Sequence, residues 1–303
     1  MAVTQTDHNL LAPARPGGVV VSGNFAVCVA ALNGSSGDLF ESRTYFSVVN
    51  LSTLTERGFG GLDDVNHPVK GTGLHSDGRV FACGNVVNMI TPATGAVESM
   101  GSSTTFSAAV SAGGAVVRLT SGSSAAQGTI TASKSTWSGG ASGFGDAIGS
   151  SGSRLFLVDD DGAPSGGAAF LEIDPSDGST VGTISSTLGT SHTLSKRGVF
   201  HSTLNMIFWA YSAGFVGLNM STDEVTLRPG TPSVSGLALI DWIVGGDGYL
   251  YGIGTAGGSH DLVAFDPQTW RWARESITTP GDLSSGVAWW GGKLWTASGE
   301  PAS

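Results

Sequence analysis

A short hairpin pattern recurs along this chain and limits what the chain can fold into. Residues 243–254 read IVGGDGYLYGIG, which predicts an apolar strand, a tight Asp-Gly turn and a second apolar strand. Aligning the copies on the apolar pair that opens the second strand gives seven of them: Phe25-Ala26, Val80-Phe81, Val116-Val117, Leu155-Phe156, Ile207-Phe208, Leu250-Tyr251 and Leu294-Trp295. Their average spacing of about 45 residues is typical of a repeat built from four β-strands.

A second hairpin follows each of the first six copies, and we label the four expected strands of a repeat A to D from the inside outward. Asp, Asn and Pro preset the backbone of its turn, which explains why the turns share a chemistry. Four of these hairpins match well, namely FSVVNLSTLTERGF, VNMITPATGAVESM, FLEIDPSDGSTVGTI and LVAFDPQTWRWARE. FVGLNMSTDEVTLRP is similar, and GTITASKSTWSGG in the third copy is degenerate.

The seventh copy stops after its B strand, and the segment AVTQTDHNLLA precedes the first A strand. A half repeat would leave strand edges exposed, and residues 1–14 can pair with it. The sequence therefore predicts one all-β domain over residues 1–303, a seven-bladed β-propeller closed by an N-terminal strand pairing with the C-terminal half blade. The blades are expected at about residues 16–60, 67–101, 105–140, 145–187, 192–231, 236–278 and 284–303.

The composition agrees with short strands and excludes several classes of function. Glycine contributes 47 of 303 residues and interrupts nearly every window, and no long segment has the 3.6-residue spacing of a helix. The net charge is -10, and no basic run exceeds Lys196-Arg197, which argues against nucleic acids and anionic membranes as partners. With no visible signal peptide, no apolar run near ~20 residues and two cysteines, synthesis in a reducing cytoplasm is expected.

The turn sequences resemble those of the broad YVTN/quinoprotein-like group of β-propellers. The likeness rests on DPxTG-like tips such as DPSDG and on DGxLY hairpins such as DGYLY, and it extends over nearly the whole chain. The Trp-Asp dipeptides of tryptophan–aspartate repeats are missing, as are the tryptophan-docking signatures of quinoprotein dehydrogenases. The resemblance therefore implies a shape and no active site.

The longer connections of a propeller, those between B and C and between D and A, are expected on one face around a central channel, where binding usually occurs. They hold the acidic and histidine residues Asp63, Asp64, Asp146, Asp159, Asp160, Asp161, Asp241, Asp261, His67, His192 and His260. A hard cation at the channel mouth would need six to eight oxygens, and VDDDG at 158–162 is the best donor segment, but it lacks the spacing of a calcium loop. A solvated acidic loop is the favoured interpretation, and no metal or cofactor is predicted.

Patterns of catalytic sites are weak. There is no HExxH, no phosphate-binding glycine motif and no GxSxG elbow, and GSSGS at 149–153 is expected to be an A–B turn. His75 and His201 fall on or beside A strands, where a satisfied histidine of the core or of the channel wall is the usual explanation. No catalytic residue is predicted.

The two cysteines and a pair of tryptophans occupy positions whose environment the repeat predicts. Cys28 and Cys83 occupy the same B-strand position in adjacent blades, and sheets ~10 Å apart are too distant for a disulfide, so both are expected as buried thiols. Trp270 and Trp272 in TWRWARE are expected on one side of an outermost strand, where exposed rings could contact a protein or stack on a sugar.

These features predict a non-enzymatic binding or structural propeller. The lysine-poor chain resembles, in composition, the tail-tip or accessory virion proteins of bacteriophages, which implies incorporation into a virion and contacts with other virion or assembly proteins or a cell-surface glycan. Asp159, Asp160, Asp161, His192, Asp241, Trp270 and Trp272 are the predicted binding residues. The alternative is a metal-dependent propeller enzyme of the lactonase, cyclotransferase or lyase type with its site at the channel mouth.

Overall fold

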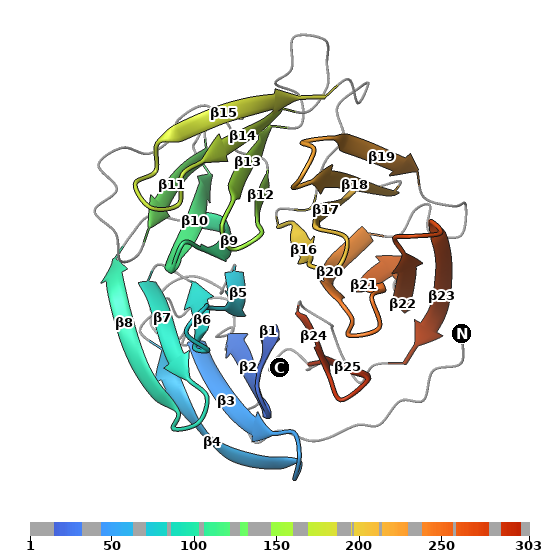
Figure 1. Ribbon diagram of the computed structural model, residues 1–303. Helices are drawn as coiled ribbons and strands as arrows, with labels where there is room; N and C mark the ends of the chain where they lie inside the picture. The colour runs from blue at the N-terminus through green and yellow to red at the C-terminus, as the bar shows by residue number, and fades with distance from the viewer. Residues whose placement is uncertain are drawn as a thin grey trace, which may run out of the picture. The chain divides into compact units, whose positions relative to one another are not determined.

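The computed structural model describes a chain made of β-strands joined by short turns (Figure 1). It covers residues 15–31, 44–62, 71–83, 86–102, 106–121, 128–132, 147–159, 169–186, 195, 197–211, 214–229, 238–256, 259–278 and 286–297. These residues form strands and no helix, so none of their segments is a helix that could cross a membrane. The all-β class predicted from the repeat is confirmed.

Five sheets have four antiparallel strands each, with neighbouring strands in chain order. The first two sheets are β1 (Arg15–Ser22), β2 (Phe25–Ala31), β3 (Thr44–Asn50), β4 (Thr55–Leu62), and β5 (Gly71–Leu74), β6 (Val80–Cys83), β7 (Val86–Thr91), β8 (Ala96–Ser102). The other three are β12 (Ala147–Ser150), β13 (Leu155–Asp159), β14 (Ala169–Ile173), β15 (Thr180–Ser185); β16 (Val199–His201), β17 (Met206–Tyr211), β18 (Gly214–Asn219), β19 (Val225–Pro229); and β20 (Ala238–Val244), β21 (Leu250–Ala256), β22 (Ser259–Asp266), β23 (Arg271–Ile277). Chain-ordered, four-stranded antiparallel sheets are the blades of a β-propeller.

Two smaller sheets complete the described strands. One has three strands, β9 (Phe106–Ala112), β10 (Ala115–Ser121) and β11 (Gly128–Ala132), and the other has two, β24 (Val287–Trp290) and β25 (Lys293–Thr296). The prediction of seven blades is therefore wrong for the residues described, which contain five four-stranded blades. The two shortfalls fall where the repeat itself fails, at the degenerate third copy and at the copy that stops after its B strand. The closing strand expected over residues 1–14 lies outside the described residues.

The predicted repeat assigns the individual strands correctly. Each of the seven apolar pairs lies in the second strand of its sheet, which is β2, β6, β10, β13, β17, β21 or β25. Each of the five well-formed second hairpins of the sequence forms the third and fourth strands of a four-stranded blade. GSSGS forms the turn between β12 and β13, as expected.

The chain divides into two compact units, which we describe separately. One consists of residues 1–104 and 240–303 and contains the sheets β1–β4, β5–β8, β20–β23 and β24–β25. In this unit, β1 contacts β5 on one side and β24 on the other. The other unit consists of residues 105–239, and in it β12 lies between β9 and β16.

Alternation along the strands lets each sheet bury both of its faces. In β13, Leu155 and Leu157 pack against the β9–β11 sheet, whereas Phe156 and Val158 pack toward the β16–β19 sheet. All four side chains are fully buried. Successive side chains of a strand point to opposite faces of its sheet. A strand whose sheet is packed on both faces therefore needs apolar residues at every position.

Trp209 shows how closely the β12–β15 and β16–β19 sheets approach. Its buried indole lies against Gly149 and Gly198, where a β-carbon would come within 2.2 Å and 2.6 Å of the ring, respectively. The indole N–H donates a hydrogen bond to the carbonyl of Ile148 at 3.2 Å. Glycine at these two positions therefore makes room for the largest side chain of the core.

The two cysteines do not form a disulfide with each other. Cys83 is buried in β6, as predicted, and Cys28 lies half-buried at the corresponding place in β2. Burial, with a smaller contribution from the charge of Glu56, raises the pKa of the Cys28 thiol to about 12. Such a thiol stays protonated at neutral pH and packs as a small apolar side chain.

Candidate functional site

The structure covers the predicted loop-face site only in part. Asp160, Asp161 and His192 lie outside the described residues. Asp159 is the half-buried last residue of β13 and pairs in register with Ala169 of β14. Asp241 lies within β20. The acidic site at this face therefore stays a prediction.

Asp261 corrects the expected distribution of acidic side chains. Its sequence position suggested the loop face, but it lies in β22 and is only 1 % exposed. Burial alone would raise the pKa of Asp261, but hydrogen bonds from the Ser276 hydroxyl (2.7 Å) and the Arg274 guanidinium (2.5 Å) outweigh it and hold the pKa below its ordinary value. Its carboxylate therefore fastens β23 to β22, a role that sequence position could not reveal.

The C–D turns of the four-stranded blades share one local structure. In four of them an Asp or Asn side-chain oxygen accepts a hydrogen bond from the backbone N–H two residues later, at 2.8–3.0 Å. We count each turn from its Asp or Asn, or from Thr91 in the β7–β8 turn. The residue four positions later has a positive φ in all five turns; these residues are Leu54, Gly95, Gly178, Asp223 and Trp270. The DPxTG-like pattern thus encodes an Asx turn that ends in a left-handed residue.

Trp270 is an unusual residue at this left-handed position. Its φ is 60°, and it ends the turn rather than lying on the outermost strand, as the sequence analysis expected. Trp272 is on β23, and both rings contact the buried Phe265, with ring centroids at 5.3 Å for Trp270 and 4.5 Å for Trp272. Both tryptophans are half-buried. We call Trp270 and Trp272 the tryptophan edge.

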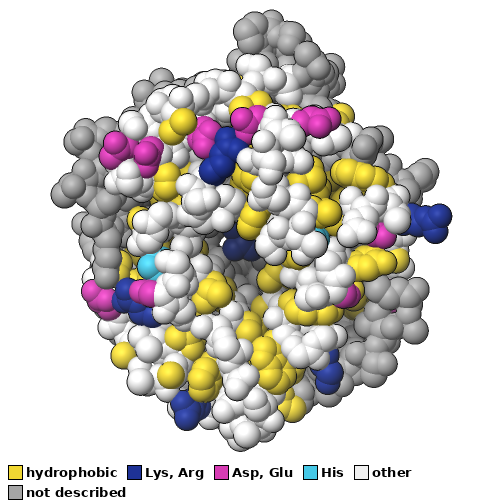
Figure 2. Space-filling model, viewed as in Figure 1, with side chains coloured by type: hydrophobic (Ala, Val, Ile, Leu, Met, Phe, Trp, Pro, Cys, Tyr) yellow, Lys and Arg dark blue, Asp and Glu magenta, His cyan; other side chains and the backbone are white. Residues whose placement is uncertain are grey.

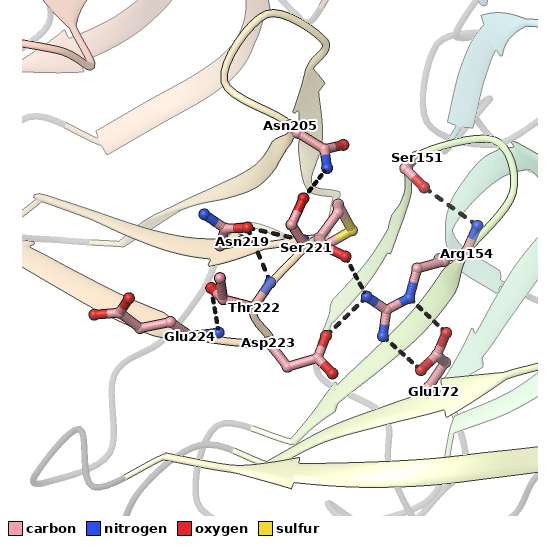
Figure 3. A network of polar contacts seen from close by, with 10 residues as sticks. Ser151, Arg154, Glu172, Asn205, Asn219, Ser221, Thr222, Asp223 and Glu224 are labelled. Carbon is pink, nitrogen blue, oxygen red and sulfur yellow. Dashed lines mark hydrogen bonds and ion pairs between the residues drawn. The ribbon is translucent and has the colours of Figure 1, made fainter.

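Arg154 forms a network that links two blades (Figure 3). It lies in the A–B turn between β12 and β13 and makes a bidentate ion pair with Glu172 of β14, at 2.6 Å and 2.7 Å. The same guanidinium donates to the carbonyl of Met220 and to the carboxylate of Asp223, both at 2.7 Å, in the C–D turn of the β16–β19 sheet. These hydrogen bonds raise the pKa of Arg154 above its ordinary value, with Glu172 contributing most.

Arg79 holds the corresponding place in the A–B turn between β5 and β6. It donates to Asp77 at 2.7 Å and 2.9 Å and to Glu98 at 2.6 Å, both within its own sheet. The hydrogen bond from Arg79, followed by weaker contributions that include His75, holds the pKa of Asp77 well below its ordinary value. The turn has an Asp-Gly sequence because Gly78 has a φ of 85°.

Tyr249 holds this place in the A–B turn between β20 and β21, which has the same backbone geometry, with Gly248 at a φ of 86°. Tyr249 is 41 % exposed, and its ring centroid lies 6.3 Å from that of Tyr251. Tyr251 stacks on Trp289 of β24, with centroids 4.9 Å apart, and donates its hydroxyl to Asp247 at 2.6 Å. Burial, followed by the hydrogen bond to Asp247, raises the pKa of Tyr251. We call Tyr249, Tyr251 and Trp289 the aromatic turn.

The two histidines beside A strands have the structural role expected for them. His201 ends β16, is 2 % exposed, and its Nδ1 accepts a hydrogen bond from the backbone of Leu204 at 3.2 Å. His75 follows β5, is buried, and its Nδ1 lies 2.9 Å from the Asp77 carboxylate. Within the covered ranges, no group of three or more His, Cys, Asp or Glu side chains could hold a metal ion.

Comparisons with known proteins show the fold. No protein-family model matches the sequence, and no curated protein matches it. A quinoprotein alcohol dehydrogenase-like protein from Bacteroides thetaiotaomicron is similar in structure, with a TM-score of 0.58 and 10 % identity over 87 % of this chain, and this chain covers 66 % of that protein. A chain of the mitotic checkpoint complex has a TM-score of 0.59 and 11 % identity, with 98 % of this chain and 96 % of that one covered.

A puromycin-hydrolyzing peptidase from Mycobacterium tuberculosis is also similar, with a TM-score of 0.55 and 12 % identity over 91 % of this chain, which spans 48 % of the peptidase chain. These proteins differ widely in what their names describe, while their folds agree. Identity near 10 % carries the fold and no activity. The chain is thus a β-propeller with quinoprotein alcohol dehydrogenase-like structural neighbours.

Proposed function

We propose that this chain is a binding protein rather than an enzyme, and that the tryptophan edge is part of the surface with which it contacts protein or carbohydrate. The observation that carries the proposal is the conformation of Trp270. Among the other four C–D turns, glycine holds this position twice, and Leu54 and Asp223 hold it in the remaining two. A left-handed backbone costs a bulky residue about 1–2 kcal/mol. The contact with Phe265 offsets part of this cost, and a binding role for the paired rings accounts for placing tryptophan there.

The charged groups of the described blades support a binding role over catalysis. A general acid needs a raised carboxyl pKa, and a general base is most effective near neutral pH. The pKa values of Asp77, Asp174, Asp261 and Asp266 are instead lowered by hydrogen bonds that hold turns and strand pairs together. These carboxylates serve the scaffold.

The more specific proposal is a virion component of a bacteriophage, assembled in the host cytoplasm and contacting other virion proteins or a cell-surface glycan. It rests on composition alone and remains a prediction. The loop-face residues Asp159, Asp160, Asp161, His192 and Asp241 belong to the same proposal as a second contact surface. A metal-dependent enzyme with a site at the channel mouth is the competing function.

A glycan array and a metal analysis of the purified full chain test this proposal together. We expect binding to array glycans that weakens in the Trp270→Ala/Trp272→Ala double variant and persists in Val181→Ala, which alters an exposed residue of another outermost strand. We also expect no change of Tm with Ca²⁺ or EDTA. A stoichiometric metal that stabilises the protein, together with an array that shows no binding, would favour the enzyme.

A further inference from the structure

The aromatic turn presents three rings where the β20–β23 and β24–β25 sheets meet, within one compact unit. Tyr251 and Trp289 stack with an interplanar angle of 17°, and Tyr249 lies next to Tyr251 at an angle of 36°. Figure 2 shows that hydrophobic side chains form several separate patches across one face of the molecule, interspersed with polar groups. Tyr249 is the most exposed of the three rings, so the set continues from a half-buried stack of Tyr251 and Trp289 to the surface.

The backbone of the turn is shaped to let these rings lie against it. A β-carbon on Gly245 would come within 2.6 Å of Tyr251 Cε2, and one on Gly246 within 2.9 Å of Trp289 Nε1. Any other residue would therefore push a ring away from the turn. Gly246 is exposed, so the rings lie beside a strip of accessible backbone.

A carboxylate lies beside the rings. Asp247 is exposed, and its two oxygens accept hydrogen bonds from the Tyr251 hydroxyl (2.6 Å) and the Tyr249 backbone N–H (3.2 Å). These two hydrogen bonds fix the carboxylate next to the aromatic surface. Each oxygen keeps a lone pair, because a carboxylate accepts about four hydrogen bonds.

The corresponding positions in two other blades show what a purely structural residue does here. Arg79 and Arg154 are tied to carboxylates of their own or the next sheet. Tyr249 is 41 % exposed, and its hydroxyl makes no hydrogen bond to any described residue. The tyrosine thus leaves a ring face and a hydroxyl available at a position where the two arginines form ion pairs.

We infer that the aromatic turn binds a neutral saccharide built from pyranose rings. A pyranose has an apolar C–H face that packs on an aromatic ring and hydroxyls at its edge that donate to a carboxylate, which is the combination offered by Tyr249 and Asp247. The net charge of -10 disfavours anionic sugars. This site lies in a different turn from the tryptophan edge and goes beyond the proposed function by naming a ligand class and its contact residues.

Native gel electrophoresis of the full chain through soluble polysaccharides tests the inference. We expect retardation by at least one of hydroxyethyl cellulose, laminarin, dextran or glycol chitin. Tyr249→Ala should weaken the binding about tenfold, as expected for a central aromatic contact, and Tyr251→Phe should weaken it less. Leu74→Ala, which removes an exposed apolar side chain near another A–B turn, is the matched control and should bind as the wild type does.

Three results would overturn the inference. Retardation by none of the four polysaccharides would exclude a neutral saccharide site, and so would unchanged binding in Tyr249→Ala with unaltered circular dichroism. If Trp270→Ala abolishes retardation and Tyr249→Ala does not, the sugar binds at the tryptophan edge. That last outcome would refute saccharide binding at the aromatic turn and would agree with the proposed binding at the tryptophan edge.

Discussion

Arg79 and Arg154 occupy the same place in the repeat but have different partners. Arg79 pairs with Asp77 and Glu98, which are 41 % and 58 % exposed and belong to its own sheet. Arg154 pairs with Glu172, which is 17 % exposed, and also reaches the carbonyl of Met220 and Asp223 in the next sheet. One arginine closes a turn, and the other joins two blades.

Two residues at the same position of the repeat can therefore contribute differently to stability. A bidentate pair with little exposure is stronger than an exposed one, because water screens the exposed charges and competes for their hydrogen bonds. The β5–β6 turn receives a neutral link from its neighbour instead, since Ser22 Oγ donates to the carbonyl of Gly78 at 2.7 Å. Both of these A–B turns therefore contact a neighbouring blade, the β5–β6 turn through a neutral hydroxyl and the β12–β13 turn through the charge of Arg154.

The largest expected effect comes from replacing the two arginines. Arg154→Met should lower the free energy of unfolding by about 2 kcal/mol, because Glu172 loses a bidentate partner while only partly solvated. Arg79→Met should cost less than about 1 kcal/mol. Urea unfolding followed by circular dichroism measures both costs. Equal costs for the two variants would show that Arg154 contributes no more to stability than Arg79.

A double-mutant cycle measures the strength of a single ion pair of each arginine. Arg154→Met with Glu172→Gln should show a coupling energy of about 1 kcal/mol, because both groups are largely removed from water. Arg79→Met with Glu98→Gln should couple by less than about 0.5 kcal/mol, since Glu98 is 58 % exposed. A larger coupling in the Arg79 cycle would show that exposure does not decide the strength of these pairs.

Local features of the fold were predictable from the sequence, whereas contacts between blades were not. The position of every B strand and the C–D hairpins of the five blades were predictable, because apolar alternation and Asx turns are local signals. The blade count was not, because GTITASKSTWSGG lacks the turn pattern on which the count depended. HSDGRVF and GSRLFLV look alike as hairpins, and nothing local distinguishes the partners of Arg79 from those of Arg154.

Candidate site residues were less predictable for a related reason. Asp261 follows a connection in sequence, so it suggested a surface ligand, yet its partners Arg274 and Ser276 come from the next strand. Trp270 was expected on a strand, and only the DPxTG alignment places it at the left-handed turn position. The aromatic turn was missed because Trp289 comes from another sheet, although GGDGY contains Gly246, which makes room for Trp289, and Gly245, which makes room for Tyr251.

Acid unfolding measures what the exposed ion pair between Asp77 and Arg79 contributes to stability. The pKa of Asp77 is lowered in the folded chain, chiefly by Arg79, so its contribution is complete above its ordinary pKa of about 4 and is lost as the pH falls through the lower folded value. Asp77→Asn keeps the turn acceptor and removes this titration. Stability measured between pH 5 and 2.5 should then fall less steeply, by about 1 kcal/mol or less because Asp77 is 41 % exposed. An unchanged slope would show that the carboxylate adds nothing to folding.

The smallest effect is expected at Asp223, where the charge link and the left-handed turn position coincide. Asp223→Asn removes the ion pair with Arg154 and keeps a residue that tolerates a φ of 58°, so it should cost about 0.5 kcal/mol, given that Asp223 is 50 % exposed. Asp223→Gly loses the same pair but relieves the backbone, as Gly178 does in its own turn, and the two terms should nearly cancel. Asp223→Ala loses the pair and keeps the strain, so it should be less stable than the glycine variant by about 1 kcal/mol. If the alanine and glycine variants unfold at the same urea concentration, the left-handed position carries no strain, and the conformation of Trp270 loses its weight as a sign of binding.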